Sequence, residues 1–362
     1  MEKIEMKLVV EDIIAGAVGQ QASDIHLVPG RPPMIRVHGD LQVYDGLPVL
    51  TPDDTQSVGK ELAGEEQWKR FVETRELDFS LSRKQLARFR VNLSWQRGSV
   101  AVALRAIPHE IPNFESLGLP SILSTFALKD HGLFLVTGPT GSGKSTTLAA
   151  MVDYINTNRS CHIVTIEDPI EYLHRHKKSL VNQREMHQDT LSFNEALRHV
   201  LRQDPNVILI GEMRDLETIQ TALTLAETGH LVLATLHTGD ASQALTRIID
   251  VYPPHQQMQA RTQLSLVMVG ILAQQLLRKR NGRGRVLAFE TLVATPALAH
   301  MIRSGEIQQV YSAMQTGAAD GMSTLNASLL HLFQEGLISR DDALHKSTRQ
   351  KELIEQMSPY RH

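Results

Sequence analysis

The chain has 362 residues, which at about 150 residues per domain suggests two domains, each long enough to bury a hydrophobic core. Lysine and arginine number 37 against 40 aspartates and glutamates, a net charge of -3, so the chain as a whole lacks a positive field that would hold a nucleic-acid backbone. The single cysteine, Cys161, excludes an internal disulfide and a tetracysteine metal site, and is typical of the reducing cytosol.

The apolar segments of the chain are too short or too interrupted to enter a membrane. Acidic residues at the start argue against a secretory signal, in which a basic run precedes an unbroken apolar one; they are Glu2, Glu5, Glu11 and Asp12. The most apolar later stretch, residues 264–273, falls far below the ~20 residues that span a bilayer. We therefore expect no membrane insertion.

Up to residue 108 the sequence predicts a small α+β domain. Apolar runs bounded by proline and glycine turns predict strands at residues 25–28, 34–37 and 77–81. Residues 88–95 alternate strictly between polar and apolar, and the run that follows repeats the pattern. If these two runs pair as a hairpin, its free face carries three basic side chains: Arg88, Arg90 and Arg105.

A linker is predicted at residues 109–116, because prolines crowd the stretch 107–112. In the second domain, residues 117–362, unbroken apolar runs at 133–136, 163–166, 207–210 and 231–236 alternate with helical patterns. Such runs are typical of strands covered on both faces, hence of a parallel α/β sheet. Ser192 with Glu195, and Asp215, predict helix N-caps. From residue 256 onward we expect mostly helix, with an interruption at 281–284 and a strand at 285–290.

The sharpest motif follows the predicted strand at 133–136 and precedes a helical pattern. Its glycines let backbone amides point at phosphate oxygens, and the helix adds its positive end. Lys144 is expected to reach the β- and γ-phosphates, and Ser145 to ligate Mg²⁺. The alternative is a glycine-rich turn with a solvated lysine. We predict an ATP site formed by nine consecutive residues: Gly138, Pro139, Thr140, Gly141, Ser142, Gly143, Lys144, Ser145 and Thr146.

Hydrolysis also needs carboxylates at the ends of neighbouring strands, which support the metal and activate water. Glu212 follows the predicted strand at 207–210, and three acids follow the one at 163–166: Glu167, Asp168 and Glu171. We expect at least one of these three to face the γ-phosphate, although each could instead be a cap or a surface charge.

Four motifs occur in order along the chain, at residues 138–146, 165–171, 201–215 and 229–238. Together they resemble the Walker A, Asp box, Walker B and His box of the type II/type IV secretion ATPase superfamily. Within it the chain looks like the type IV pilus retraction ATPases, the PilT and PilU group, over almost its whole length. The resemblance implies an α/β fold, with a RecA-like P-loop ATPase domain preceded by a smaller α+β PAS-like domain.

The resemblance also implies roles for single residues. Glu171 matches the general base for the attacking water, and Glu212 matches the Walker B glutamate on the Mg²⁺ side. His230 and His237 match a pair that senses the γ-phosphate or the subunit interface. Cationic side chains contributed across a subunit interface would stabilise the transferring phosphoryl group; the matching residues here are Arg88, Arg90, Arg105 and Arg247.

At the level of the assembly, the resemblance implies a homo-hexameric, cytoplasmic motor that hydrolyses ATP with Mg²⁺ to drive pilus retraction and twitching motility through domain rotations. It would sit at the cytoplasmic face of the inner membrane on a platform protein. Three alternatives stay open: a pilus assembly or secretion ATPase, an accessory PilU-like subunit that depends on a paralogous retraction ATPase, and a RecA-like nucleic-acid translocase. The aromatic content of 5% and the net charge disfavour the translocase.

Overall fold

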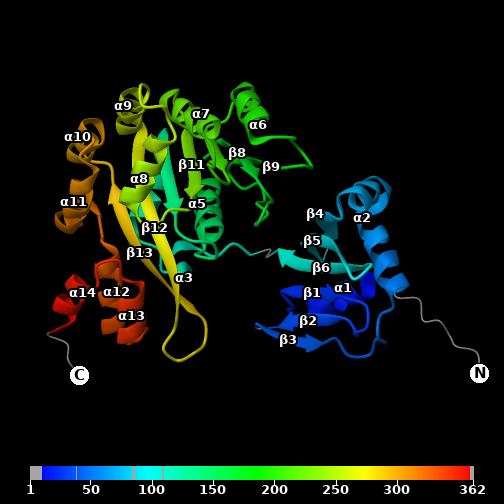
Figure 1. The fold of residues 1–362 in the computed structure, drawn as a ribbon. Coiled ribbons are helices and arrows are strands. Elements are labelled where there is room, and N and C mark those ends of the chain that lie inside the picture. Colours follow the sequence, from blue (N-terminus) through cyan, green and yellow to red (C-terminus); the bar gives the residue numbers. More distant parts are fainter. Residues whose placement is uncertain (1–9, 38, 84–85, 108–109, 359–362) are drawn as a thin grey trace, which may run out of the picture. The chain divides into compact units, whose positions relative to one another are not determined.

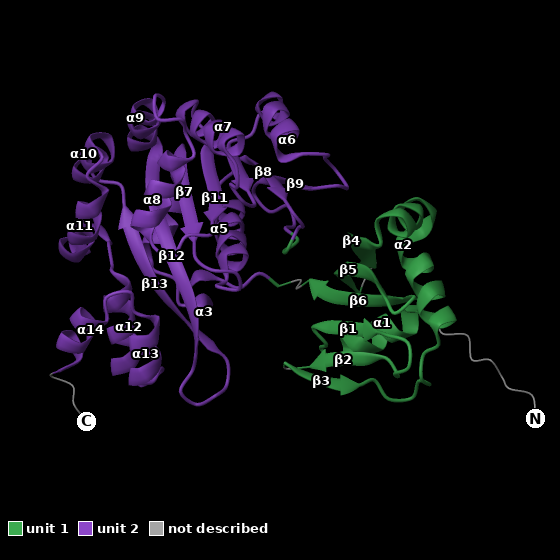
Figure 2. Ribbon diagram, viewed as in Figure 1, with its two compact units in different colours: residues 1–110, 171–173 green, residues 111–170, 174–362 purple. Residues whose placement is uncertain are grey.

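The structure is a computed structural model that describes residues 10–37, 39–83, 86–107 and 110–358, in two compact units (Figures 1 and 2). Unit 1 comprises Met1–Glu110 with Glu171–Leu173, and unit 2 comprises Ile111–Ile170 with His174–His362. The predicted domain boundary at residue 108 and the first residue of the predicted linker lie outside the described residues. A short helix, α3 (Phe114–Leu117), occupies part of the span predicted as linker. No helix in the described ranges is long and apolar enough to cross a bilayer.

Unit 1 is built on a six-stranded antiparallel sheet in the order β3-β2-β1-β6-β5-β4. The strands predicted from apolar runs are confirmed within two residues at each end, and β5 and β6 pair as the expected hairpin. The short edge strand β3 was not predicted; its four residues alternate between polar and apolar, but the run is short and all four are exposed. The elements of unit 1 are α1 (Val10–Gly19), β1 (Asp24–Leu27), β2 (Met34–Val37), β3 (Asp40–Val43), α2 (Pro52–Thr74), β4 (Glu76–Arg83), β5 (Ala87–Gln96) and β6 (Ser99–Ile107).

One face of this sheet carries the core of unit 1. The apolar residues of β5 are buried, with Phe89, Val91 and Leu93 at most 1% exposed, as alternation predicts. At one edge of the core, Phe71 lies 5.2 Å from Trp68 and 5.9 Å from Trp95 between ring centroids. Both tryptophans of the chain therefore belong to this aromatic cluster in unit 1.

Unit 2 is built on a seven-stranded sheet in the order β13-β12-β7-β11-β10-β8-β9. All neighbouring pairs are parallel except β12 with β13, so the predicted parallel α/β sheet is confirmed. Its strands are β7 (Gly132–Thr137), β8 (His162–Glu167), β9 (Leu180–Glu185), β10 (Val207–Ile210), β11 (Leu231–Leu236), β12 (Met268–Arg278) and β13 (Arg285–Val293). Its further helices are α4 (Ile122–Ala127), α5 (Lys144–Asn158), α6 (Phe193–Val200), α7 (Leu216–Glu227), α8 (Ala241–Asp250), α9 (Gln257–Val267), α10 (Pro296–Ser304), α11 (Val310–Thr316), α12 (Leu325–Gln334), α13 (Arg340–Lys346) and α14 (Gln350–Met357).

The expectation of mostly helix from residue 256 onward is wrong over β12. This strand pairs in parallel with β7 and antiparallel with β13. Its first seven residues are all buried, and periodicity cannot separate a short buried strand from a buried helix. Gly270 sits where any side chain would collide with Phe126 and with the main chain of β13. The polar edge strand β9 was also not predicted.

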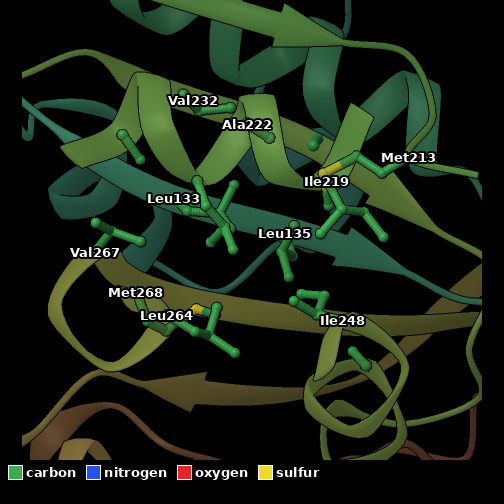
Figure 3. Close-up of a cluster of buried hydrophobic side chains, with 14 of the residues drawn as sticks. Leu133, Leu135, Met213, Ile219, Ala222, Val232, Ile248, Leu264, Val267 and Met268 are labelled. Atoms are coloured by element: carbon green, nitrogen blue, oxygen red, sulfur yellow. The ribbon is translucent and has the colours of Figure 1, made fainter. Parts of the chain in front are cut away.

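Hydrophobic side chains pack on both faces of the unit 2 sheet. In β7, Leu133 and Leu135 point into one layer, where they meet Ile219 and Ala222 of α7 (Figure 3). Phe134 and Val136 alternate into the other layer, which contains residues of α4 and α5. The strand that leads into the glycine-rich loop is thus fixed from both sides.

The predicted helix starts at Ser192 and Asp215 are confirmed. The Ser192 hydroxyl accepts the Glu195 N–H at 3.1 Å, and the Asp215 carboxylate accepts the Thr218 N–H at 2.9 Å. These caps satisfy amides that the first helical turn leaves unpaired. They fix the starts of α6 and α7 beside the strands that carry the acidic motifs.

Candidate functional site

The glycine-rich loop leaves β7 and enters α5 in the conformation that anion binding needs. Gly141 and Gly143 have φ values of 77° and 91°, a region that favours glycine. A Cβ at Gly138 would overlap the main-chain oxygen of Gln274. The N-cap position of α5, Gly143, provides no side-chain cap. The first amides of α5 and its positive end are therefore available to a phosphate.

Lys144, the first residue of α5, is folded back onto this loop. Its ammonium group donates to the carbonyl oxygens of Gly138 at 2.8 Å and Pro139 at 3.2 Å. Burial lowers the pKa of Lys144, and the nearby Glu212 carboxylate partly opposes that effect. A phosphate that displaced the two carbonyl groups would offer this cation a charged partner, which makes a stronger bond than a neutral one.

The strand order brings the acidic and histidine motifs to the same edge as the loop. β11 lies between β7 and β10, and all three run in parallel, so their carboxyl ends share one edge. Glu212, after β10, lies 3.2 Å from Nε2 of His237, after β11. This contact joins the glutamate that the resemblance assigns to the Mg²⁺ side and a histidine that it assigns to the γ-phosphate or the subunit interface.

Arg214, which the sequence reasoning missed, completes this cluster. Its guanidinium lies 2.7 Å from the Glu212 carboxylate. Partial burial raises the pKa of Glu212, but the Arg214 hydrogen bond and the His237 charge outweigh burial and hold that pKa below its ordinary value. The charge of Asp168 adds to the effect of Glu212 in raising the pKa of Arg214. The only available signal was its position two residues after Glu212.

Two threonines fix the segment that carries His237. The Thr137 hydroxyl, at the end of β7, accepts the Thr238 N–H at 3.0 Å and lies 2.6 Å from the Thr238 hydroxyl. Thr235 in β11 donates to the Gly211 carbonyl at 2.6 Å. The His-box loop is thereby bonded both to the strand before the phosphate loop and to the residue before Glu212.

His230 does not join this cluster. It precedes β11, whereas His237 follows it, and six residues of strand span about 20 Å. The His230 Nδ1 atom lies 3.0 Å from the Leu225 carbonyl oxygen at the end of α7. The γ-phosphate role implied for His230 gains no support within its own subunit, and its role at a subunit interface stays a prediction.

Residues 171–173, which include Glu171, group with unit 1, whereas the glycine-rich loop belongs to unit 2. Glu167, at the end of β8, accepts a hydrogen bond from Thr165 at 2.6 Å. The role of Glu171 as general base stays a prediction.

The prediction that three arginines share one face of the hairpin is confirmed. Arg90 pairs directly with Arg105 across β5 and β6, and Arg88 lies two residues along β5 on the same face. Arg105 donates to Asp24 at 2.8 Å, while Arg90 lies 3.8 Å from Asp78. Burial raises the pKa of Asp24, but bonds from Arg105 and Ser23 hold it below its ordinary value. Arg247 lies on the exposed side of α8 in unit 2.

The oxygen donors near the loop suit Mg²⁺. They are the exposed Ser145 hydroxyl in the first turn of α5 and the Glu212 carboxylate. Within the described ranges there is no cluster of three or more His, Cys, Asp or Glu residues that would hold a metal alone. Mg²⁺ usually takes one or two protein oxygens and completes its shell with phosphates and water. The donor set therefore fits Mg²⁺ in the company of a nucleotide.

The sequence and the fold of the chain are similar to those of known proteins. The chain is 47% identical to the type IV pilus retraction ATPase PilT of Pseudomonas aeruginosa, over 93% of this chain and 98% of that one. It is 42% identical to the type IV pilus ATPase PilU of the same organism, over 92% and 87%. The crystal structure of the pilus retraction motor PilT with bound ADP superposes with a TM-score of 0.90 at 50% identity, covering 95% and 98%. A family model for type II/IV secretion system proteins matches residues 2–293, and the chain therefore belongs to that family.

Proposed function

We propose that the chain is an ATP-hydrolysing motor subunit that drives retraction of type IV pili. The observation that carries the proposal is the joint placement of the phosphate loop and the Glu212–Arg214–His237 cluster at one sheet edge. Similarity to PilT along almost the whole chain supports the coupling to pili, and the ADP bound in the solved PilT supports a nucleotide as ligand.

In this proposal the loop amides and the start of α5 cradle the β- and γ-phosphates. Lys144 leaves the Gly138 and Pro139 carbonyl groups and donates to phosphate oxygens. Ser145 and Glu212 hold Mg²⁺, which when bound neutralises charge that develops on the phosphates. His237 donates to Glu212, so the position of His237 depends on whether Glu212 also binds Mg²⁺.

The remaining parts of the reaction rest on residues outside this cluster. Glu171 accepts the proton of the attacking water as general base. The basic face of unit 1, formed by Arg88, Arg90 and Arg105, supplies cations to the nucleotide of a neighbouring subunit in a homo-hexamer, with Arg247 as a further cation. Heterologous contacts of this kind close into a ring by rotation. Binding and hydrolysis then drive rotations between the two units.

The motor would work in the cytoplasm, on an inner-membrane platform protein. An accessory role beside a paralogous motor is the second candidate, because the chain is also 42% identical to PilU over 92% of its length. Expression in a strain that lacks its retraction ATPase separates the two, since a principal motor restores twitching motility alone and an accessory subunit does not.

The central test is the ATPase rate of the purified chain measured across a range of protein concentrations, with mass determination at each. We expect the rate per subunit to rise with concentration together with the hexamer fraction. Full turnover by a monomer at every dilution would refute the proposal that neighbouring subunits share the site. A lack of turnover in fully formed hexamers would refute the proposed ATPase activity.

A further inference from the structure

A buried glutamine on β12 contacts the phosphate loop, although it belongs to none of the four sequence motifs. Gln274 is 1% exposed, and its Nε2 donates to the Ser142 carbonyl oxygen at 2.7 Å. Its Oε1 accepts from the Thr147 hydroxyl, in the first turns of α5, at 2.9 Å. One amide side chain thus joins the loop and the helix that follows it.

The partners fix the orientation of this amide. A carbonyl oxygen can only accept a hydrogen bond, so the nitrogen of Gln274 faces Ser142 and the oxygen faces Thr147. Both bonds are buried, and a group buried without its partner costs the full desolvation penalty.

The bond to Ser142 constrains an amide that the loop needs. In a planar trans peptide the carbonyl of one residue and the N–H of the next point in opposite directions. Because Gln274 holds the Ser142 carbonyl, the Gly143 N–H points away from β12. Gly143 is the N-cap of α5, so this N–H belongs to the set that faces a phosphate.

Gln274 itself is held from two sides. β12 pairs with β7 up to the contact of Ala273 with Thr137, directly before the loop, and Gln274 pairs with Phe289 of β13. Further along the same strand, Leu277 packs in the cluster of the carboxy-terminal helices α12 to α14. The position of the glutamine therefore depends on the sheet and on the carboxy-terminal helices.

We propose that Gln274 is a positioning residue for nucleotide binding, which sets the Ser142–Gly143 peptide so that its N–H faces the phosphates. The inference rests on the proposed ATPase function and adds a residue to it. The loop amide contacts phosphate in both the ground state and the transition state. Loss of the Gln274 side chain, which positions this amide, therefore raises KM more than it lowers kcat.

The test compares Gln274→Met with Thr147→Val in the full chain. Gln274→Met keeps the length of the side chain and loses both bonds, whereas Thr147→Val loses a buried bond to the same glutamine and leaves the Ser142 contact. Dissociation constants are measured by titration with a fluorescent ADP analogue, and KM and kcat by steady-state ATP hydrolysis. We expect about five- to tenfold weaker binding and a raised KM in Gln274→Met, the effect of roughly one net hydrogen bond, and less than a twofold change in Thr147→Val.

Equal weakening in the two variants, or unchanged binding in Gln274→Met, would overturn the inference while leaving the ATPase proposal intact. A wild-type chain that fails to bind the analogue would overturn both. If Gln274→Met does not fold, Gln274→Leu replaces it, because its branched apolar side chain likewise cannot donate to Ser142. Wild-type affinity in that variant would equally refute the positioning role.

Discussion

Glu290 of β13 gives a quantitative prediction for the dependence of stability on pH. This side chain is 4% exposed, and its Oε1 accepts the Ala241 N–H at 2.7 Å, at the start of α8 just after the His box. Burial raises the pKa of Glu290 from 4.5 to about 7, with a hydrogen bond from Ala241 opposing and the charge of Asp240 reinforcing the rise; the Leu325 N–H and Arg349 favour the charged form.

The sign follows from comparing the folded and unfolded chains. A carboxyl with a higher pKa in the folded chain binds more protons there, so its contribution to stability is complete below about pH 4.5 and is lost as pH rises through 7. At 1.36 kcal/mol per pKa unit, the total loss is about 3 kcal/mol, and most of it falls between pH 5 and 8. Glu290→Gln cannot ionise and removes this slope.

The assay is urea-induced unfolding followed by circular dichroism at pH 5, 6, 7 and 8. The free energy of unfolding of the wild type, taken relative to Glu290→Gln, should fall by about 2 to 3 kcal/mol across that range. Glu355→Gln, on the exposed side of α14, serves as the matched control and should keep the wild-type slope. Parallel pH profiles for wild type and Glu290→Gln would refute the reasoning.

Three further predictions concern turnover. Lys144→Ala should lose nucleotide binding in a fluorescent ADP titration, since no other loop side chain carries positive charge; retained affinity would show that the amides suffice. Glu171→Gln should bind ATP but lose hydrolysis by 10²-fold or more in steady-state assays, because an amide cannot take a proton from water, and near-normal turnover would remove Glu171 from the base role. Mixed rings of Arg90→Ala and Lys144→Ala subunits should regain part of the activity that each lacks alone, and an absence of recovery at every ratio would count against a site shared between subunits.

The strands that could be predicted have a pattern of polar and apolar residues that follows from which of their faces are buried. Strict alternation in β5 identified a half-buried strand, and the unbroken runs of β7 and β11 identified strands covered on both faces. The unpredicted parts lack such a signal. β9 lies at the sheet edge with a mixed polar surface, and β12 is apolar on both sides in a length that also suits a helix.

The residues of the site also differ in whether the sequence could predict them. Lys144 was found from its motif, Glu212 from its place after a strand and His237 from the family resemblance, and the structure places them at one edge of the sheet. Gln274 was missed because it lies more than a hundred residues from the loop, and only the pairing of β12 with β7 brings it there. Long-range pairing of this kind leaves no trace in local sequence.

The aromatic cluster of unit 1 has a practical consequence. Trp68 and Trp95, the two tryptophans of the chain, both contact Phe71, and the Arg75 guanidinium lies 5.2 Å from the Trp95 ring centroid. The proposed nucleotide loop lies in the other unit. Tryptophan emission is therefore a label-free gauge of unit 1, and a change in its intensity when ATP is added would show that unit 1 responds to the nucleotide, through its own subunit or through the nucleotide of a neighbouring one.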